Sequence, residues 1–599
     1  MIFPFSWRKV CLAAACIAIA LAVRAQSPAA KPESTLRVGL WTLWHDKAVT
    51  VSPASDGRAT LRSCENCSPI PLTNSTQIRA DGDSLFYSGR NSAQTILLTG
   101  PVTLSAHGET LTLRNPVRIT ARNGELVLAV TLPVESYVER VVASESGPAD
   151  SSESLKALAI VVRSFALHQK HNHADYDLCD STHCQLLHWG GNPARSSAAH
   201  AATLATAGET LWYRGQRAQA WFHQNCGGRT AAPAEVWLTR GSPQKPMPWL
   251  VSRTDSYCTA GGARLWSANI SLGDLTAALS TAGLVSPGWK SLRVGRRGES
   301  GRAVTVLADS TEISAEEFRL AVGRTLGWNK ILSTWFEIAP QDGQFLFHGR
   351  GSGHGVGLCQ AGAAAMAAQG REVNEILAQY FPGAEAADES AGKSWQSFRS
   401  AGFVLETLNP ADAAFLPDLN RALAEAQSLS GINMSGIAQS SFGPATPITV
   451  RSFPSTPAFR AATLAPGWVA AFTEGNWIAT QPLSTLAARK LLAPTLRHEF
   501  LHVLVESQAA EKTPLWLREG LVEAWSEGTS GFQSAHRPAI RIEELDRILA
   551  HAATEAQSES AHRAAGWYAT QLLARYGRTQ VLAWLRTGVS AEALADLSR

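Results

Sequence analysis

The stretch that most constrains how this chain folds is residues 133–185, where two helical patterns lead into a dense group of cysteines and histidines. Four valines within residues 134–142 recur at spacings of three and four, which places them on one face of a short helix. Gly147 and Pro148 should end that helix, so Glu145 stands at its end, beside a loop. A carboxyl held there against apolar neighbours can act as a general acid, because burial raises its pKa. The alternative is an exposed surface glutamate.

A second helix is expected to begin at Ser151 or Ser152, either of which supplies an N-cap hydroxyl. Arg163 lies on this helix, where its guanidinium could orient Glu145 or an anionic substrate group. The alternative for Arg163 is an ordinary surface ion pair. The apolar stripe that should face a core consists of Leu155, Leu158, Ala159, Val162, Phe165 and Ala166.

Four metal-ligand residues follow within a dozen positions: His173, Cys179, His183 and Cys184. Together they would close a tetrahedral zinc site with no open position, which is the arrangement of a structural zinc. The alternative is a disulfide between Cys179 and Cys184 with the histidines as bystanders, because the chain looks exported.

Four runs in fixed order carry a family resemblance: VERVVASESGPADSSESLKALAIVVRSFAL, DLCDSTHCQ, GRGSGHGVGLCQAGAAAMAAQG and ILAQYFPG. Together they resemble the SpoIID/LytB family, the stage II sporulation protein D and amidase enhancer proteins, over about residues 35–383. The resemblance implies a lytic transglycosylase that acts on peptidoglycan glycan strands lacking stem peptides. It places the catalytic acid on Glu145 and a bound zinc on the four cysteines and histidines named above. Where the family usually has Met-Pro after the acid, this chain has Ser146-Gly147.

The glycine-rich segment 349–362 is either a tight turn or a backbone that lies close to a ligand. In the family that it resembles, this motif lies by the active cleft. His354 and Gln360 are therefore expected to be substrate-binding residues.

The positions of the remaining cysteines and the expected oxidising compartment predict which of them form disulfides. Cys64 and Cys67 lie in a loop, where a local disulfide is expected. Cys226 and Cys258 are expected to form a second disulfide in an oxidising compartment, which leaves Cys359 as the odd thiol.

The length of the chain indicates the number of domains, and its N-terminus indicates the cellular location. A chain of 599 residues with a formal charge of +3 suggests two or three domains and shows no sign of a nucleic-acid-binding protein. Residues 1–25 have a basic start, an apolar run and a small-residue exit, so we expect a signal peptide cleaved near Ala25. The mature protein should then be secreted, periplasmic or in the cell envelope. Residues 35–132 alternate as short strands, with a hairpin at Asn123-Gly124.

The C-terminal part contains the sharpest single motif, HEFLH, in which His498 and His502 are spaced to lie on one face of a helix. Two such histidines can grip one zinc, and Glu499 between them can take a proton from an attacking water. Glu519, in WLREG, can return from a second helix as a third ligand, which leaves an open position typical of a catalytic zinc. The set resembles the gluzincin peptidases of the MA-like group over about residues 400–590. In this set Tyr568 is either a transition-state stabiliser or a core residue.

These patterns predict an α+β, multidomain protein in which a mixed strand and helix domain precedes a mainly helical, zincin-like domain. We expect a SpoIID/LytB-like domain over 35–383, a linker over 384–395 and a peptidase-like domain over 396–599. The predicted function is peptidoglycan remodelling by a lytic transglycosylase joined to a zinc peptidase that cleaves a peptide or protein. The alternative is a wall-binding enhancer of a cell-wall amidase, with the peptidase as the only enzyme.

Overall fold

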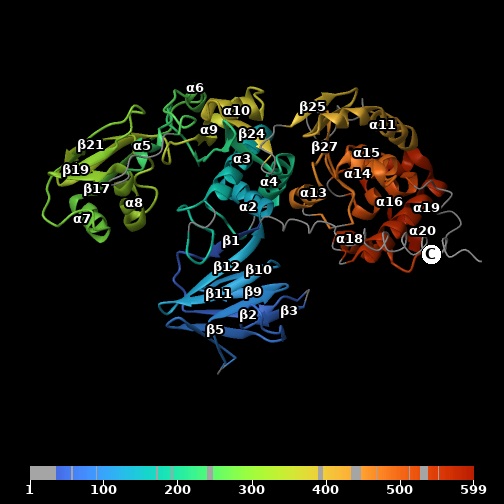
Figure 1. Cartoon of the computed structure of the whole chain (residues 1–599), viewed down its shortest axis with the longest axis horizontal. Coiled ribbons are helices and arrows are strands. Elements are labelled where there is room, and N and C mark those ends of the chain that lie inside the picture. The colour runs from blue at the N-terminus through green and yellow to red at the C-terminus, as the bar shows by residue number, and fades with distance from the viewer. Residues whose placement is uncertain are drawn as a thin grey trace, which may run out of the picture.

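The computed structural model places several lobes around a helical centre (Figure 1). A strand-rich lobe formed by the N-terminal residues lies below the helical centre, and the C-terminal unit lies to the right of that centre. The expected signal peptide falls outside the described residues. The structure describes residues 35–598 apart from 56–57, 89–90, 170–172, 191–192, 239–246, 389–394, 434–446, 464, 467, 511–512, 527–536, 551 and 553.

The strand-rich lobe consists of two sheets packed on one hydrophobic core, as the alternation of residues 35–132 predicts. Asn123 and Gly124 both have positive φ and join two paired strands, so the predicted hairpin is confirmed. The seven-stranded sheet has the order β13-β1-β12-β11-β8-β3-β4, with β1 Thr35–Leu40, β3 Ala59–Arg62, β4 Ile70–Leu72, β8 Thr95–Thr99, β11 Val117–Arg122, β12 Glu125–Pro133 and β13 Leu178–Cys179. The six-stranded sheet has the order β10-β9-β2-β5-β6-β7, with β2 Ala48–Pro53, β5 Thr76–Asp81, β6 Ser84–Tyr87, β7 Asn91–Ala93, β9 Val102–Ala106 and β10 Glu109–Leu113.

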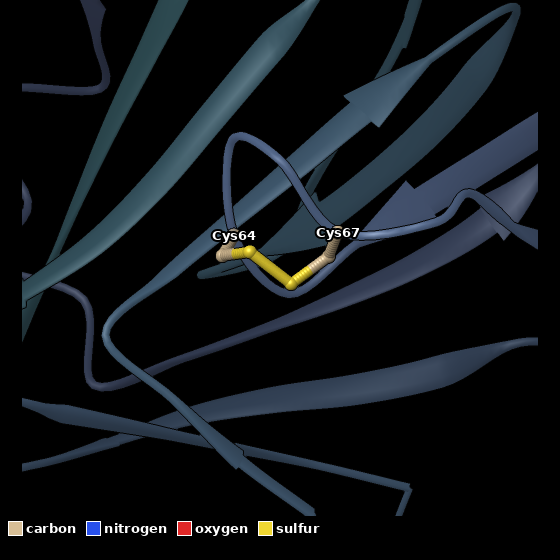
Figure 2. The surroundings of a disulfide bond; sticks show 2 residues. All are labelled: Cys64 and Cys67. Atoms are coloured by element: carbon tan, nitrogen blue, oxygen red, sulfur yellow. A yellow bond between two sulfur atoms is a disulfide. The ribbon is translucent and has the colours of Figure 1, made fainter.

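One of the two predicted disulfides is present in the structure and the other is not. Cys64 and Cys67 are joined, which confirms the predicted local disulfide (Figure 2). Cys226 and Cys258 are both free thiols, so the second predicted disulfide is wrong.

The helical centre is built on the two helices that the sequence predicts. The first, α2 (Val134–Glu145), buries its valines, and the second, α3 (Ser152–His168), starts after the N-cap Ser151 and buries its whole apolar stripe. Around them lie α4 Pro193–Ala205, β14 Glu209–Tyr213, β15 Gln216–Arg217, β16 Phe222–His223, α5 Pro233–Val236, α6 Ser256–Thr259, β23 Leu358–Cys359, α9 Gln360–Ala368, α10 Val373–Tyr380 and β24 Glu385–Asp388. Strand β24 pairs with β14, so part of the expected linker 384–395 is a strand of this unit.

A smaller lobe with its own hydrophobic core is inserted between α6 and β23. It carries two three-stranded sheets and two helices, and lies on the left in Figure 1. Its elements are β17 Leu265–Ser271, α7 Leu272–Thr281, β18 Leu292–Val294, β19 Thr305–Ala308, β20 Thr311–Ser314, α8 Ala315–Leu326, β21 Phe336–Gln341 and β22 Gln344–Arg350.

The C-terminal unit combines a five-stranded mixed sheet with helices around a separate core. The expectation of a mainly helical domain therefore missed this sheet, whose order is β25-β26-β27-β29-β28. Its elements are β25 Gln396–Arg399, β26 Phe403–Thr407, η1 Pro410–Phe415, α11 Leu416–Ser430, β27 Ile448–Ser452, α13 Thr456–Thr463, β28 Ala471–Glu474, β29 Trp477–Thr480, α14 Leu483–Ala488, α15 Leu492–Glu506, α16 Leu515–Ser526, α18 Ile542–Ala550, α19 Glu555–Thr587 and α20 Ala591–Ser598. No helix in the described part of the chain combines the length and the apolar character needed to cross a membrane.

The C-terminal unit packs directly on the helical centre. A small apolar core joins the end of α4 to Phe453, which directly follows β27, and to residues of α13 and β29. Beside it, the buried guanidinium of Arg451 pairs with Glu209 at 2.9 Å and with Glu406 at 2.7 Å. His200 bridges Glu139 and Glu474, and these hydrogen bonds, Glu139 first, raise its pKa to about 10.

Candidate functional site

Glu145 is the last residue of α2, where the helix gives way to the loop that leads to α3. Burial raises the pKa of its carboxyl to about 7, and a hydrogen bond from the backbone N–H of Leu186 opposes the shift only in part. A carboxyl with such a pKa holds its proton for much of the time near neutral pH, which a general acid requires.

The segment that follows the cysteines holds the end of α2 from one side. Besides the N–H of Leu186 on Glu145, the N–H of His188 donates to Ser144 Oγ at 2.8 Å. Arg140 of α2 donates to the carbonyl of Trp189 at 3.4 Å. The position of Glu145 therefore depends on the fold of this segment.

The predicted cluster of His173, Cys179, His183 and Cys184 is assembled directly before that segment. All four ligand atoms lie within 4.8 Å of one another. His173 Nε2 lies 3.3 Å from Cys184 Sγ, and His183 Nδ1 lies 3.7 Å from each sulfur. Both cysteines are free thiols, so the alternative of a disulfide between them is not what the structure has.

Without a metal the surroundings of the cluster favour one thiolate, because the hydrogen bond between the two cysteines lowers the pKa of Cys179 and raises the pKa of Cys184. The pKa of Cys179 is lowered to about 4, first by the hydrogen bond from Cys184 and then by Ser181 and His183. The backbone N–H of Cys179 donates to Cys184 Sγ at 3.3 Å. Two thiolates and two imidazoles fit a closed tetrahedral zinc site.

Replacement of Cys179 by Ser is expected to lower the melting temperature of the full-length protein, because a closed zinc site supplies folding energy. The catalytic activity of the folded variant should be affected less. Thermal unfolding with and without a chelator measures this. The chelator should lower the melting temperature of the wild type, and should have a smaller effect on the variant. Equal melting temperatures for the two proteins would argue against a structural metal here.

Arg163 does not take the predicted place beside Glu145, and this prediction needs correction. Its side chain is only 1% exposed and forms a two-pronged ion pair with Glu135 of α2, at 2.9 and 2.6 Å. Its remaining nitrogen donates to the carbonyl of Glu209 at 2.9 Å. Arg163 thus ties α3 to α2 and β14, because a buried guanidinium needs a partner for its charge and its donors.

The glycine-rich segment returns to Glu145 from the other side. Gln360, the first residue of α9, donates its side-chain amide to the carbonyl of Glu145 at 3.0 Å. His354 lies against the rings of Trp237 and His223, and burial lowers its pKa to about 4. The structure therefore brings Gln360 to the backbone of Glu145, whereas His354 contacts the rings of His223 and Trp237.

The glycines of this segment are required by close backbone packing. Gly351 and Gly357 have positive φ, and a Cβ on either would overlap a backbone carbonyl oxygen of the segment 221–225. β23 pairs with β16 of that segment in parallel. The interpretation of the motif as a tight turn is thus confirmed, whereas the proximity of this backbone to a ligand stays a prediction.

The second candidate site lies on α15, which carries HEFLH as predicted. His498 and His502 lie on one face with their Nε2 atoms 3.0 Å apart, and Glu519 Oε2 from α16 lies 3.6 Å from His502 Nε2. Burial lowers the pKa of both histidines to about 4, so both imidazoles are neutral and can act as ligands. This set is not among the two groups of described residues whose ligand atoms all lie within 4.8 Å of one another.

Glu499 lies between these histidines and is 6% exposed. Burial raises its pKa to about 7, against a hydrogen bond from Thr473 Oγ1 on β28 at 2.6 Å.

Tyr568 is a core residue, because it is 1% exposed and donates to the carbonyl of Ile540 at 3.2 Å.

His562 and Glu523 also belong to this site, although no sequence spacing singled them out. His562 of α19 lies 3.5 Å from Glu519 and 3.3 Å from Glu523. Both line a cavity of about 280 Å³ whose other residues are Trp468, Glu555, Ser558, Glu559 and Arg563. Glu519 and Glu523 are spaced to lie one turn apart on α16, which is a sequence signal for Glu523, whereas no comparable spacing marks His562.

Comparison with known proteins bears on the helical centre and on the inserted lobe. Residues 122–213 match the family model of SpoIID, stage II sporulation protein. The SpoIID resemblance is therefore supported over the part of the chain that holds Glu145. Residues 262–357 match a domain of unknown function (DUF8618), which coincides with the inserted lobe.

Relatives agree with the SpoIID match. An uncharacterized protein of Brachyspira hyodysenteriae is 28% identical over 44% of this chain and 70% of its own length. A stage II sporulation protein D of Bacillus amyloliquefaciens is 25% identical over 42% of this chain and 74% of its own. The amidase enhancer of Bacillus subtilis is 26% identical over 41% of this chain and 39% of its own. These relatives point to a cell-wall-related protein of the sporulation type.

Proposed function

We propose that this chain is an exported peptidoglycan-remodelling protein whose SpoIID-like part is a lytic transglycosylase for glycan strands without stem peptides. The observation that carries the proposal is Glu145, a half-buried carboxyl with a pKa of about 7 that accepts from the backbone N–H of Leu186, while the backbone carbonyl of the same residue accepts from Gln360. The similarity to stage II sporulation protein D supports a role in the cell wall.

In the proposed reaction Glu145 gives its proton to the glycosidic oxygen as the bond from that oxygen to the muramic C1 breaks. The C6 hydroxyl of the same muramic residue bonds to C1, and its proton passes to the Glu145 carboxylate. The products are a free sugar hydroxyl and a 1,6-anhydro-muramic end, with no water consumed. One carboxyl is sufficient because it acts first as acid and then as base.

The cleavage rate should fall as the pH rises through about 7, because only the protonated form of Glu145 donates and burial raises its pKa to that value. The measurement is the release of anhydro-muramic ends from denuded glycan between pH 5 and 9, with circular dichroism at each pH as the control for folding. A cleavage rate that stays constant from pH 5 to 9 would contradict the assignment of Glu145 as the general acid.

The second candidate for this part is a wall-binding enhancer of a cell-wall amidase, which the similarity to an amidase enhancer favours. The two proposals give different results on purified denuded glycan. A transglycosylase produces anhydro ends without any partner, whereas an enhancer produces none and increases the rate of an added amidase.

We further propose that the C-terminal unit is a zinc peptidase. The residue types fit a metal, since two neutral imidazoles lie 3.0 Å apart and the nearer one, His502, lies 3.6 Å from Glu519, whose buried Oε2 lacks a hydrogen-bond donor. Zn²⁺ held by His498, His502 and Glu519 would supply Lewis-acid activation of a water nucleophile. Glu499 would then take a proton from the attacking water and return it to the leaving amine.

A peptide or protein is the substrate that the neighbouring sheet suits best. β28 is an edge strand of the five-stranded sheet, and its Thr473 contacts Glu499. An edge strand has unpaired backbone groups that can bind an extended chain. A substrate bound along β28 would thus pass beside Glu499.

A further inference from the structure

We propose a second structural zinc site, formed by Cys226, Asp255, Cys258 and Cys359. Their four ligand atoms lie within 4.8 Å of one another. Three thiolates and one carboxylate oxygen are ligands that zinc accepts, and four of them close a tetrahedral site. This site is separate from the cysteine and histidine cluster after α3, and its metal content does not depend on the proposed activities.

The burial of an acid among thiols is the first argument for a cation. Cys226, Asp255 and Cys359 are fully buried, and Cys258 is 6% exposed. Free thiols pack well in apolar cores, but a carboxylate does not. Asp255 Oδ2 accepts from Tyr380 at 2.9 Å and lies 3.2 Å from Cys226 Sγ. A divalent cation between the sulfurs and this oxygen would compensate the buried charge.

The backbone around the sulfurs is the second argument. The N–H of Cys226 points to Cys359 Sγ at 3.2 Å, and the N–H of Gly228 points to Cys226 Sγ at 3.4 Å. Backbone donors aimed at sulfur stabilise the thiolate, which is the form that binds metal. Asp255 is oriented in the same way, because its Oδ1 accepts from the N–H of Cys258 at 3.0 Å.

A buried cationic side chain, Arg302, lies next to the cluster. Three thiolates, one carboxylate and Zn²⁺ have a net charge of about −2. Arg302 is fully buried, donates to the carbonyl of Cys226 at 2.9 Å, and has no hydrogen-bond partner at its Nε. Its positive charge offsets part of the negative charge of the ligands.

The site would join three segments that are distant in sequence and would support the active centre. Cys226 follows β16, Cys258 lies on α6, and Cys359 ends β23. Cys359 directly precedes Gln360, which contacts Glu145. Glu145 would thus be held between two zinc sites, one acting through Leu186 and the other through Gln360.

The test is the zinc content of the full-length chain, exported by its host and purified without reductant. Cys359→Ser and Asp255→Asn should each lower the zinc content relative to the wild type, by about one ion per chain for the cysteine variant. Cys184→Ser, the matched control, should lose the ion of the other cluster only. The double variant Cys184→Ser/Cys359→Ser should lose both. Unchanged zinc in Cys359→Ser would overturn the proposal.

Two measurements on the wild type keep the test independent of variant folding. After replacement of zinc by Co²⁺, the sulfur-to-cobalt charge-transfer absorbance should correspond to five thiolates in two sites, and not to two. Peptide mapping under non-reducing conditions should find Cys226, Cys258 and Cys359 unlinked, and reactive to alkylation only after chelation. A disulfide between Cys226 and Cys258, or an absorbance of only two thiolates, would overturn the proposal.

Discussion

Glu145→Gln is expected to abolish the release of anhydro-muramic ends from denuded glycan, with a loss of about 10²–10⁴-fold. The amide has nearly the shape of the carboxyl and can still accept the Leu186 N–H, but it cannot supply a proton to the glycosidic oxygen. The fold and zinc content should therefore remain those of the wild type. Mass spectrometry of the products from strands of defined length measures the loss.

The matched control is Glu139→Gln, on the same helix. Among the described residues the Glu139 carboxyl forms its ion pair with His200, away from the Leu186 contact of Glu145, so this variant should keep most of the activity. Full activity in Glu145→Gln would show that another group is the acid. A wild type without activity that stimulates an added amidase would favour the enhancer function.

Glu499→Ala is expected to retain zinc and to lose amide hydrolysis, by about 10²–10⁴-fold, because the proton acceptor is removed while the ligands stay. His498→Ala and Glu519→Ala should lose both the metal and the activity. The measurements are zinc analysis of the full-length protein and hydrolysis of a casein-like substrate and of wall peptides. The contrast separates the base from the ligands.

The control for this set is Glu506→Gln, on the same helix as Glu499. Its side chain pairs with Arg518 at 2.9 Å and can keep a hydrogen bond as the amide, so zinc and turnover should change little. Cleavage by Glu499→Ala of a substrate that the wild type cleaves, with zinc retained, would show that this motif is not the catalytic centre.

Local pattern was sufficient for the elements that carry both sites. The valine spacing before Glu145 and the stripe of α3 each report a helical face, because burial of one face has the period of the helix itself. The same holds for HEFLH, which α15 presents as two histidines on one face. Asn123-Gly124 likewise fixed a hairpin, because its backbone angles are local.

The contacts between side chains that are distant in sequence were decided only by the tertiary structure. Arg163 pairs with Glu135 rather than near Glu145, Cys226 and Cys258 are free thiols beside Cys359, and His562 joins Glu519 from a helix that no motif marked. Spacing along a chain reports which residues share a face. It does not report which faces meet, because that depends on how the strands and helices are connected and packed. The pKa of Glu145 is therefore a property of the assembled fold, since the burial that raises it comes from that packing.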